Sequence, residues 1–198
     1  MSYSIAEKKL MKKDKLLKNI IVSNTHLKHI LIKSNLYHSL INIIISQFIS
    51  TQAAKSISEK MMKHFGTEIF IPRHFYSLTI DEIKKLGLST NKSKSVTEVT
   101  KLFIDSDLEV LIPDMTEEQV DTLLLSIYGI GPWSVQMFKL FTLGYQDIFS
   151  AKDAALRKAM ENLDMVPIDS PESLYEEYSQ QWAPYRSIAS RHLWASLH

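Results

Sequence analysis

The 198-residue sequence contains no cysteine, and its basic residues outnumber its acidic residues by only one. A disulfide framework, a thiolate metal site and a cysteine-ligated iron–sulfur cluster are therefore excluded. A net charge of +1 gives little support for a polyanionic partner, so any nucleic-acid contact has to come from local patches and backbone donors. The seven histidines show no paired metal-ligand spacing.

The sequence also lacks an apolar run of 18 residues and a signal-peptide pattern. We therefore expect a soluble, monomeric, intracellular protein without membrane contact, cytoplasmic in a prokaryote and nuclear in a eukaryote. Hydrophobic residues make up 45% of the chain, enough to bury one or two compact cores. No repeat or low-complexity tract interrupts it, and we predict one domain with two lobes over residues 1–198.

Apolar residues recur at three- and four-residue spacing, which predicts an all-α fold. Residues 1–23 hold six lysines and predict a basic helix or a frayed arm, whose lysines form either a solvated face or a DNA contact. Ser23 or Asn24 is expected to cap the next helix, and Ser170 and Pro171 to begin a later one. Residues 41–49 also suit a β-strand, but we favour two helices that meet near Phe48.

Residues 116–143 predict two helices joined by a tight turn. Thr116 and Gln119 form a capping box, and apolar spacing continues the first helix to residue 128. Gly129 and Gly131 allow a left-handed turn, and Pro132 begins a second helix that runs to about residue 143. This hairpin exposes backbone N–H groups at a helix N-terminus, where a phosphate oxygen can bind.

The stretch from Leu124 to Trp133, followed by Asp153, resembles the helix-hairpin-helix DNA glycosylases, and within them the 3-methyladenine DNA glycosylase II branch. The resemblance covers residues 24–198 and implies a two-lobed helical fold with the active-site cleft between the lobes. Phe48 and Leu86 depart from the family's pattern in two of its loops. The absence of cysteine separates the chain from the endonuclease III branch, which carries an iron–sulfur cluster.

The resemblance implies a monofunctional enzyme of base excision repair that flips alkylated purines, such as 3-methyladenine or 7-methylguanine, out of double-stranded DNA and excises them. Asp153 stands at the family's catalytic aspartate, whose carboxylate stabilises positive charge on the sugar and activates water. By spacing alone, Ser150 and Asp153 also suit an N-cap and its N3 partner. Trp133 stands where strand-cleaving relatives carry a nucleophilic lysine, so no Schiff base is expected.

Further site residues follow from the same resemblance. Trp133 and Trp194 are expected to line the base pocket, unless they belong to the core, and the weaker pocket candidates are Tyr185, Met137 and Tyr128. Phe48 is expected to be the wedge that fills the gap left by the flipped nucleotide, or else a core residue. The residues expected at the DNA backbone are Gly129, Gly131, Trp133, Ser134, Lys92 and Lys139.

No cofactor is expected to be required, although the resemblance implies a monovalent cation, Na⁺ or K⁺, on the main-chain carbonyls of Leu125, Ile127 and Ile130. A different class of function also fits a helical hairpin, namely a non-catalytic module that binds damaged or kinked DNA. Asp153 discriminates between the two, because such a module has no use for a buried carboxylate that faces DNA.

Overall fold

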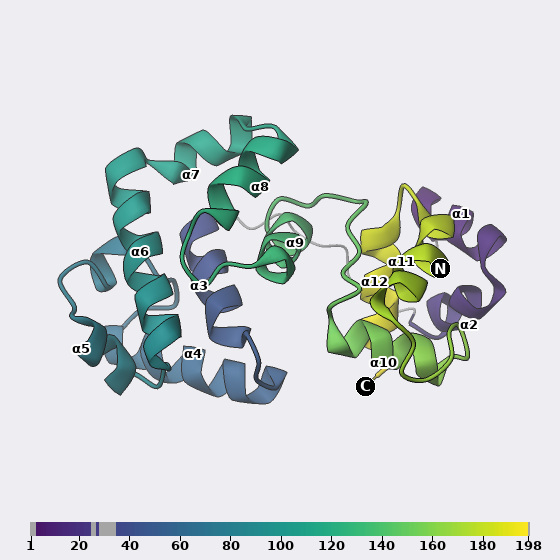
Figure 1. Ribbon diagram of the computed structural model, residues 1–198, viewed down its shortest axis with the longest axis horizontal. Helices are drawn as coiled ribbons and strands as arrows, with labels where there is room; N and C mark the ends of the chain where they lie inside the picture. The colour runs from purple at the N-terminus through teal and green to yellow at the C-terminus, as the bar shows by residue number, and fades with distance from the viewer. Residues whose placement is uncertain (1–2, 25–26, 28–34, 198) are drawn as a thin grey trace. The chain divides into compact units, whose positions relative to one another are not determined.

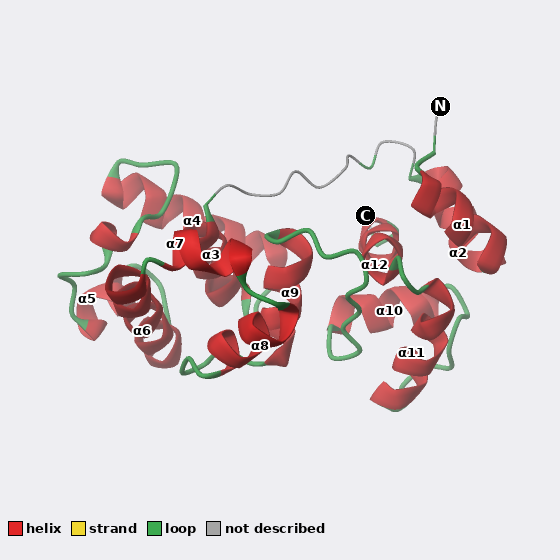
Figure 2. Ribbon diagram, turned by 90° about the horizontal axis from the view of Figure 1, so that it is seen from above, coloured by secondary structure: helices red, strands yellow, loops and turns green. Residues whose placement is uncertain are grey.

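The computed structural model describes residues 3–24, 27 and 35–197. Within these residues the chain forms helices and loops and no strand, so the predicted all-α fold is confirmed (Figures 1 and 2). The helix expected after Asn24 lies outside the described residues. The chain divides into two compact units, which we call the terminal unit (residues 1–31 and 139–198) and the hairpin unit (residues 32–138). No described helix combines the length and the apolar composition that a membrane span requires.

The hairpin unit is built around one buried helix, α3, which packs against α4 and α6. The side chains of Leu40, Ile41 and Ile44 on α3 are completely buried. The β-strand alternative for residues 41–49 is wrong, because α3 continues to Ser46 and a short loop leads into α4. The elements of this unit are α3 (Leu36–Ser46), α4 (Thr51–Phe65), η1 (Pro72–His74), α5 (Ile80–Lys85), α6 (Thr90–Ser106), α7 (Leu108–Leu111), η2 (Ile112–Asp114), α8 (Glu117–Leu125) and the first part of α9 (Pro132–Phe141).

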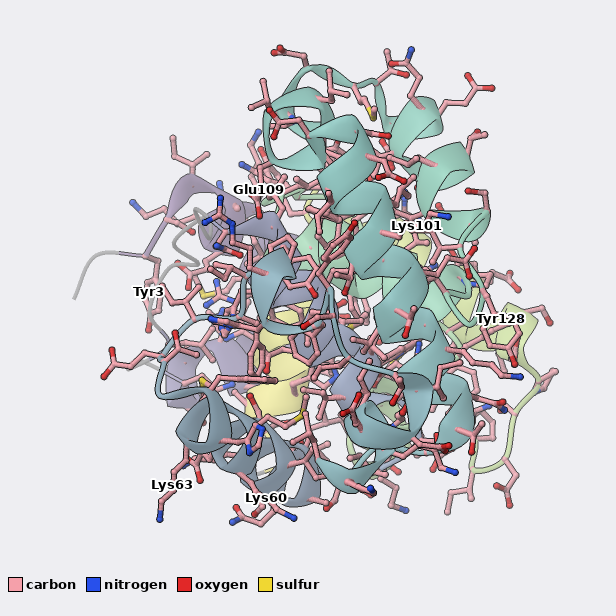
Figure 3. The ribbon with its side chains drawn as sticks, turned by 90° about the vertical axis from the view of Figure 1, so that its left-hand side faces the viewer. Tyr3, Lys60, Lys63, Lys101, Glu109 and Tyr128 are labelled. Atoms are coloured by element: carbon pink, nitrogen blue, oxygen red, sulfur yellow. The ribbon has the colours of Figure 1, made fainter. Side chains whose placement is uncertain are left out.

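Polar side chains from neighbouring helices hold both ends of α3. The carboxylate of Glu109 on α7 accepts the first two N–H groups of the helix, at 3.0 and 2.8 Å (Figure 3). The ammonium of Lys92 on α6 donates to the carbonyl of Ile45 at 2.7 Å. Backbone groups at helix ends have no partner within the helix, so these bonds fix where α3 begins and ends.

The terminal unit combines both ends of the chain. It contains α1 (Ile5–Lys13), α2 (Lys15–Ser23), α10 (Ala154–Asn162), α11 (Glu172–Ser179), η3 (Gln180–Trp182), α12 (Arg186–Ala195) and the last residues of α9. Residues 5–23 therefore form two packed helices, and the expectation of a frayed arm is wrong for them. Leu10 and Leu17 are completely buried, and Asp14 between the helices accepts from the Trp182 indole N–H at 2.8 Å.

Several predicted helix ends shift by a few residues. The hairpin helices end at Leu125 and Phe141, before residues 128 and 143. Asn24 closes α2, since its backbone N–H donates to Ile20. Pro171 is itself the N-cap of α11, and the hydroxyl of Ser170 donates to the Pro167 carbonyl instead of capping the helix. Helix ends depend on local polar contacts that apolar spacing does not encode.

Candidate active site and nucleic-acid interface

The turn between α8 and α9 has the predicted hairpin geometry at Gly129. Its φ is +77°, and a Cβ at this position would collide with the Ser95 side chain on α6, so the position requires glycine. Gly131 differs from the prediction, because its backbone is not left-handed. A Cβ on Gly131 would meet nothing within 4 Å, and its carbonyl accepts the first-turn N–H of Val135. Gly131 thus leaves an open surface at the start of α9.

Helix α6 supports the turn from one side. The Tyr128 backbone N–H donates to Glu98 at 3.1 Å, and its hydroxyl donates to Asn91 at 3.1 Å. The Lys94 ammonium lies 5.9 Å from the centre of the Tyr128 ring. Tyr128 is exposed on this face (Figure 3). These contacts make Tyr128 a support of the hairpin turn, whereas its proposed place in the base pocket stays a prediction.

The loop between α3 and α4 supports the same turn from the other side. The amide nitrogen of Gln47 donates to the Gly129 carbonyl at 2.9 Å and to the Ser134 hydroxyl at 2.8 Å. Phe48 follows with a φ of +58° and an exposed fraction of 102%, so the reading of Phe48 as a core residue is wrong. A left-handed conformation is energetically unfavourable for phenylalanine, and a fully exposed ring contributes nothing to packing within the protein. The two features together indicate a contact with another molecule.

The two lysines predicted at the DNA backbone have other surroundings. The Lys92 ammonium already donates to Ile45, and burial lowers its pKa. Lys139 is buried, with 5% of its surface exposed. Lys139 is thus not a solvated surface charge and Lys92 is half-buried, and contact of either lysine with the DNA backbone stays a prediction. Backbone N–H groups at the start of α9 are further donors that suit a phosphate oxygen.

Asp153 is buried, with 8% of its surface exposed, and it is the N-cap of α10. Its Oδ1 accepts the Leu156 backbone N–H at 2.8 Å and the Trp194 indole N–H at 3.0 Å. The spacing had suggested Ser150 as the N-cap and Asp153 as its partner, and this is wrong, because Asp153 caps the helix itself. Two donors on one oxygen fix the rotamer of the carboxylate.

Trp194 lies on α12, in the same unit as Asp153. Its indole ring packs against Phe141, with ring centres 5.3 Å apart and planes inclined by 31°. Trp194 is partly buried and packs against the hydrophobic core of the terminal unit, so a core role and a place in the base pocket both stay open. The same side chain therefore offers an aromatic surface and orients the carboxylate of Asp153.

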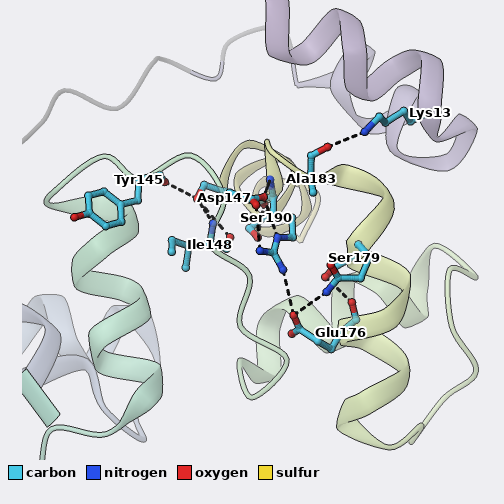
Figure 4. Close-up of polar contacts among 11 residues, drawn as sticks. Lys13, Tyr145, Asp147, Ile148, Glu176, Ser179, Ala183 and Ser190 are labelled. Atoms are coloured by element: carbon cyan, nitrogen blue, oxygen red, sulfur yellow. Dashed lines mark hydrogen bonds and ion pairs between the residues drawn. The ribbon is translucent and has the colours of Figure 1, made fainter. Parts of the chain in front are cut away.

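Hydrogen bonds and an ion pair connect the segment between α9 and Asp153 to the start of α12 (Figure 4). The Arg186 guanidinium binds both oxygens of Asp147, at 2.9 and 3.1 Å, and contacts Glu176 at 3.3 Å. The Ser187 hydroxyl donates to the Tyr145 carbonyl at 2.6 Å. Burial opposes ionisation of Asp147, but the hydrogen bonds and charge of Arg186 outweigh it and lower its pKa. This network connects the segment before Asp153 to the helix that carries Trp194.

The remaining pocket candidates, Tyr185, Met137 and Trp133, are all partly or fully buried. Tyr185 is partly buried, and its hydroxyl accepts from Lys9 on α1 at 3.2 Å. Met137 is buried on α9, and Trp133 is partly buried at the start of that helix. The Tyr185 hydroxyl thus contacts the N-terminal helix, and the residue packs against the hydrophobic core of the terminal unit. The roles of Tyr185, Met137 and Trp133 in a base pocket stay predictions.

Sequence reasoning missed two features of the site. It placed Gln47 in a family loop but did not find its bonds to the hairpin. The partners Gly129 and Ser134 lie 82 and 87 positions further along the chain. It also missed the bond from Trp194 to Asp153, 41 positions apart. The burial of Gln47 and the exposure of Phe48 become visible only in the structure, so no local pattern indicated these bonds. No local pattern indicates the Trp194 contact.

Comparison with known families is consistent with this geometry. Residues 41–184 match the family model described as "HhH-GPD superfamily base excision DNA repair protein". The match covers more than half of the chain, so the chain belongs to the HhH-GPD superfamily of base excision DNA repair proteins. The predicted resemblance to helix-hairpin-helix glycosylases is thereby confirmed.

The chain is also similar to individual curated proteins and solved structures. DNA-3-methyladenine glycosylase 1 of Schizosaccharomyces pombe is 26% identical over 169 residues, which cover 82% of this chain and 72% of that protein. The YfjP protein of Bacillus subtilis is 25% identical over 170 residues, which cover 82% of this chain and 59% of that one. The structure of S. pombe 3-methyladenine DNA glycosylase (Mag1) in complex with abasic DNA has a TM-score of 0.88 at 23% identity, covering 98% of this chain and 96% of that one. This similarity shows the same fold.

Proposed function

We propose that the protein is a monofunctional DNA glycosylase that releases alkylated purines of the 3-methyladenine and 7-methylguanine type from duplex DNA and leaves an abasic site. The observation that carries the proposal is Asp153, a buried carboxylate held by two N–H donors at a helix N-terminus. The cap of α10 requires only the bond from Leu156, whereas the bond from Trp194 orients the carboxylate beyond what the cap requires. Relatives named 3-methyladenine glycosylases support the same substrate class.

The chemistry follows from the charge that develops on the sugar. Cleavage of the bond between C1′ and the base nitrogen passes through a transition state with positive charge near C1′. The carboxylate of Asp153 stabilises that charge and accepts a proton from the water that adds to C1′. The electron pair of the broken bond goes to the base. An alkylated purine is already cationic and leaves as a neutral molecule, so no dedicated general acid is required.

The product should be an abasic site in an intact strand. Trp133 occupies the position where a lysine would be needed to attack C1′ and form a Schiff base. Its indole can instead stack on an electron-poor alkylated base, as can the ring of Trp194. The residue types thus favour hydrolysis by water over strand cleavage.

DNA binding depends on the hairpin and on Phe48. Backbone N–H groups at the start of α9, near Gly131, bind a phosphate oxygen, and the open space around Gly131 admits the DNA backbone. Ser134 contributes its backbone N–H in the first turn of α9, and its buried hydroxyl accepts from Gln47. Phe48 fills the gap that the extruded nucleotide leaves in the base stack.

A monovalent cation fits the hairpin turn through main-chain oxygens alone. The Ile127 carbonyl accepts the Ile130 N–H at 3.1 Å and retains a second lone pair for a cation. The other two proposed ligands are the carbonyls of Leu125 and Ile130. Such a cation would supply positive charge at the hairpin turn. The described residues offer no cluster of three acidic, histidine or cysteine side chains for a metal ion.

The decisive experiment is incubation of the protein with methylated duplex DNA and chromatography of the released bases. We expect free 3-methyladenine or 7-methylguanine, and strand breaks only after treatment with alkali. Borohydride should trap no covalent complex with DNA. Tight binding to damaged DNA without any base release would instead support the non-catalytic module, and borohydride trapping would contradict the monofunctional mechanism.

Replacement of Trp194 by phenylalanine tests how Asp153 is oriented. The change keeps an aromatic ring but removes one of the two donors on Oδ1. A hydrogen bond to a charged group contributes roughly 1.5–3 kcal/mol, so we expect single-turnover base release to slow by about 10- to 150-fold. Trp182→Phe is the matched control, because its indole donates to Asp14 in the same unit. The control should lower thermal stability, and an equal loss of activity in both variants would argue against a specific role of Trp194.

A further inference from the structure

The side chain of Gln47 connects two parts of the hairpin unit that are far apart in the sequence. Gln47 ends α3, and its backbone continues directly into Phe48. Its amide nitrogen donates to the carbonyl of Gly129, in the hairpin turn, and to the hydroxyl of Ser134, in the first turn of α9. The loop that presents the exposed aromatic ring is thereby bonded to the element that presents backbone N–H groups.

The chemistry of the partners fixes the orientation of this amide. The Gly129 carbonyl can only accept a hydrogen bond, so the nitrogen of the Gln47 side chain has to face it. Gln47 is 8% exposed and Ser134 is 2% exposed, so water does not compete freely for these groups. Loss of the amide would leave the buried Ser134 hydroxyl without this donor, which is unfavourable.

The loop itself is short and conformationally restricted. Only Phe48 and Ile49 separate Gln47 from Ser50, whose hydroxyl accepts the Ala53 N–H and caps α4. The left-handed conformation of Phe48, with a φ of +58°, is unfavourable for a residue with a Cβ and persists only where neighbours enforce it. Gln47 on one side and the cap of α4 on the other supply this restraint.

We propose that Gln47 is a positioning residue that sets the Phe48 ring at a fixed place relative to the phosphate-binding turn. Binding of a phosphate at the hairpin and insertion of Phe48 into the base stack then occur as one rigid step, without ordering of the loop on DNA. This inference rests on the proposed function and assigns a role to a residue that contacts neither the base nor the reacting atoms.

Replacement of Gln47 by methionine provides the test, because the side chain keeps its length but loses its donors. We expect excision of an alkylated base from duplex DNA to slow by about tenfold or more. Excision from single-stranded DNA, which requires no wedge, should change by less than about threefold. Gln52→Met, on the exposed start of α4, is the matched control and should leave both rates unchanged. An equal loss on both substrates would mean that Gln47 is only structural.

A double-mutant cycle separates positioning from stability. If Gln47 acts through Phe48, the Gln47→Met change should have little further effect on duplex excision once Phe48 is alanine. Multiplicative effects of the two changes would overturn the proposal. Ser134→Ala, which removes one of the two acceptors, is the substitute test if Gln47→Met fails to fold. We expect this variant to show an intermediate loss of duplex selectivity, and no loss would also overturn the proposal.

Wedge insertion can be measured without catalysis. A duplex with an abasic-site analogue next to 2-aminopurine reports insertion of an aromatic ring as a change in fluorescence. We expect the parent protein to produce this change and Gln47→Met to reduce it at saturating protein. An equal fluorescence change in both proteins would refute the positioning role, whatever the base-release assay shows. A parent protein that inserts Phe48 but releases no base would refute the proposed function alone.

Discussion

Replacement of Asp153 by asparagine is expected to slow release of alkylated bases by about a thousandfold, because the variant lacks the negative charge that stabilises the sugar in the transition state. The fold should persist. Asparagine is an equally good N-cap, and its oxygen can still accept from the Leu156 N–H and the Trp194 indole. Binding to a duplex with an abasic-site analogue should therefore stay close to that of the parent protein.

The measurement is single-turnover base release with each protein, together with binding to the abasic analogue. Asp164→Asn is the matched control: Asp164 is exposed in the same unit, and its left-handed conformation, with a φ of +53°, suits asparagine. The control should release bases at the parental rate. Base release by Asp153→Asn within a few fold of the parental rate would remove Asp153 from the mechanism.

The helical pattern of the chain could be predicted because apolar spacing and capping boxes are local signals. Thr116 begins α8 with the predicted capping box, and Thr79 begins α5 with another. Residues 1–23 were harder to interpret, since six lysines conceal an apolar face. That face is completed by Trp182, which is distant in the sequence and binds Asp14. A contact of this kind cannot be recognised from either segment alone.

The candidate site shows the same limit. The position of Asp153 followed from the resemblance, but its role as the N-cap of α10 did not follow from the spacing of Ser150. Lys92 had the right charge for a phosphate contact, yet its ammonium binds the end of α3. Side-chain type indicates which chemistry is available, whereas the partner of a polar group is set by packing between distant segments.

Phe48→Ala is expected to slow excision from duplex DNA by about 5- to 150-fold, since stacking of one aromatic ring on a base contributes roughly 1–3 kcal/mol. Excision from single-stranded DNA should change little, because little unstacking is needed there. The Phe48 side chain is fully exposed in the free protein, so its removal creates no cavity and the melting temperature should stay within about a degree of the parent value.

Two further variants show whether the aromatic ring is what matters. Phe48→Leu keeps an apolar wedge and should lose less duplex activity than the alanine variant. Tyr76→Ala removes another exposed aromatic ring from the hairpin unit and should leave the ratio of duplex to single-strand rates unchanged. An unchanged ratio in Phe48→Ala would show that the exposed ring of Phe48 does not enter the duplex. The alkylated base would then have to be extruded without a side chain that fills its place.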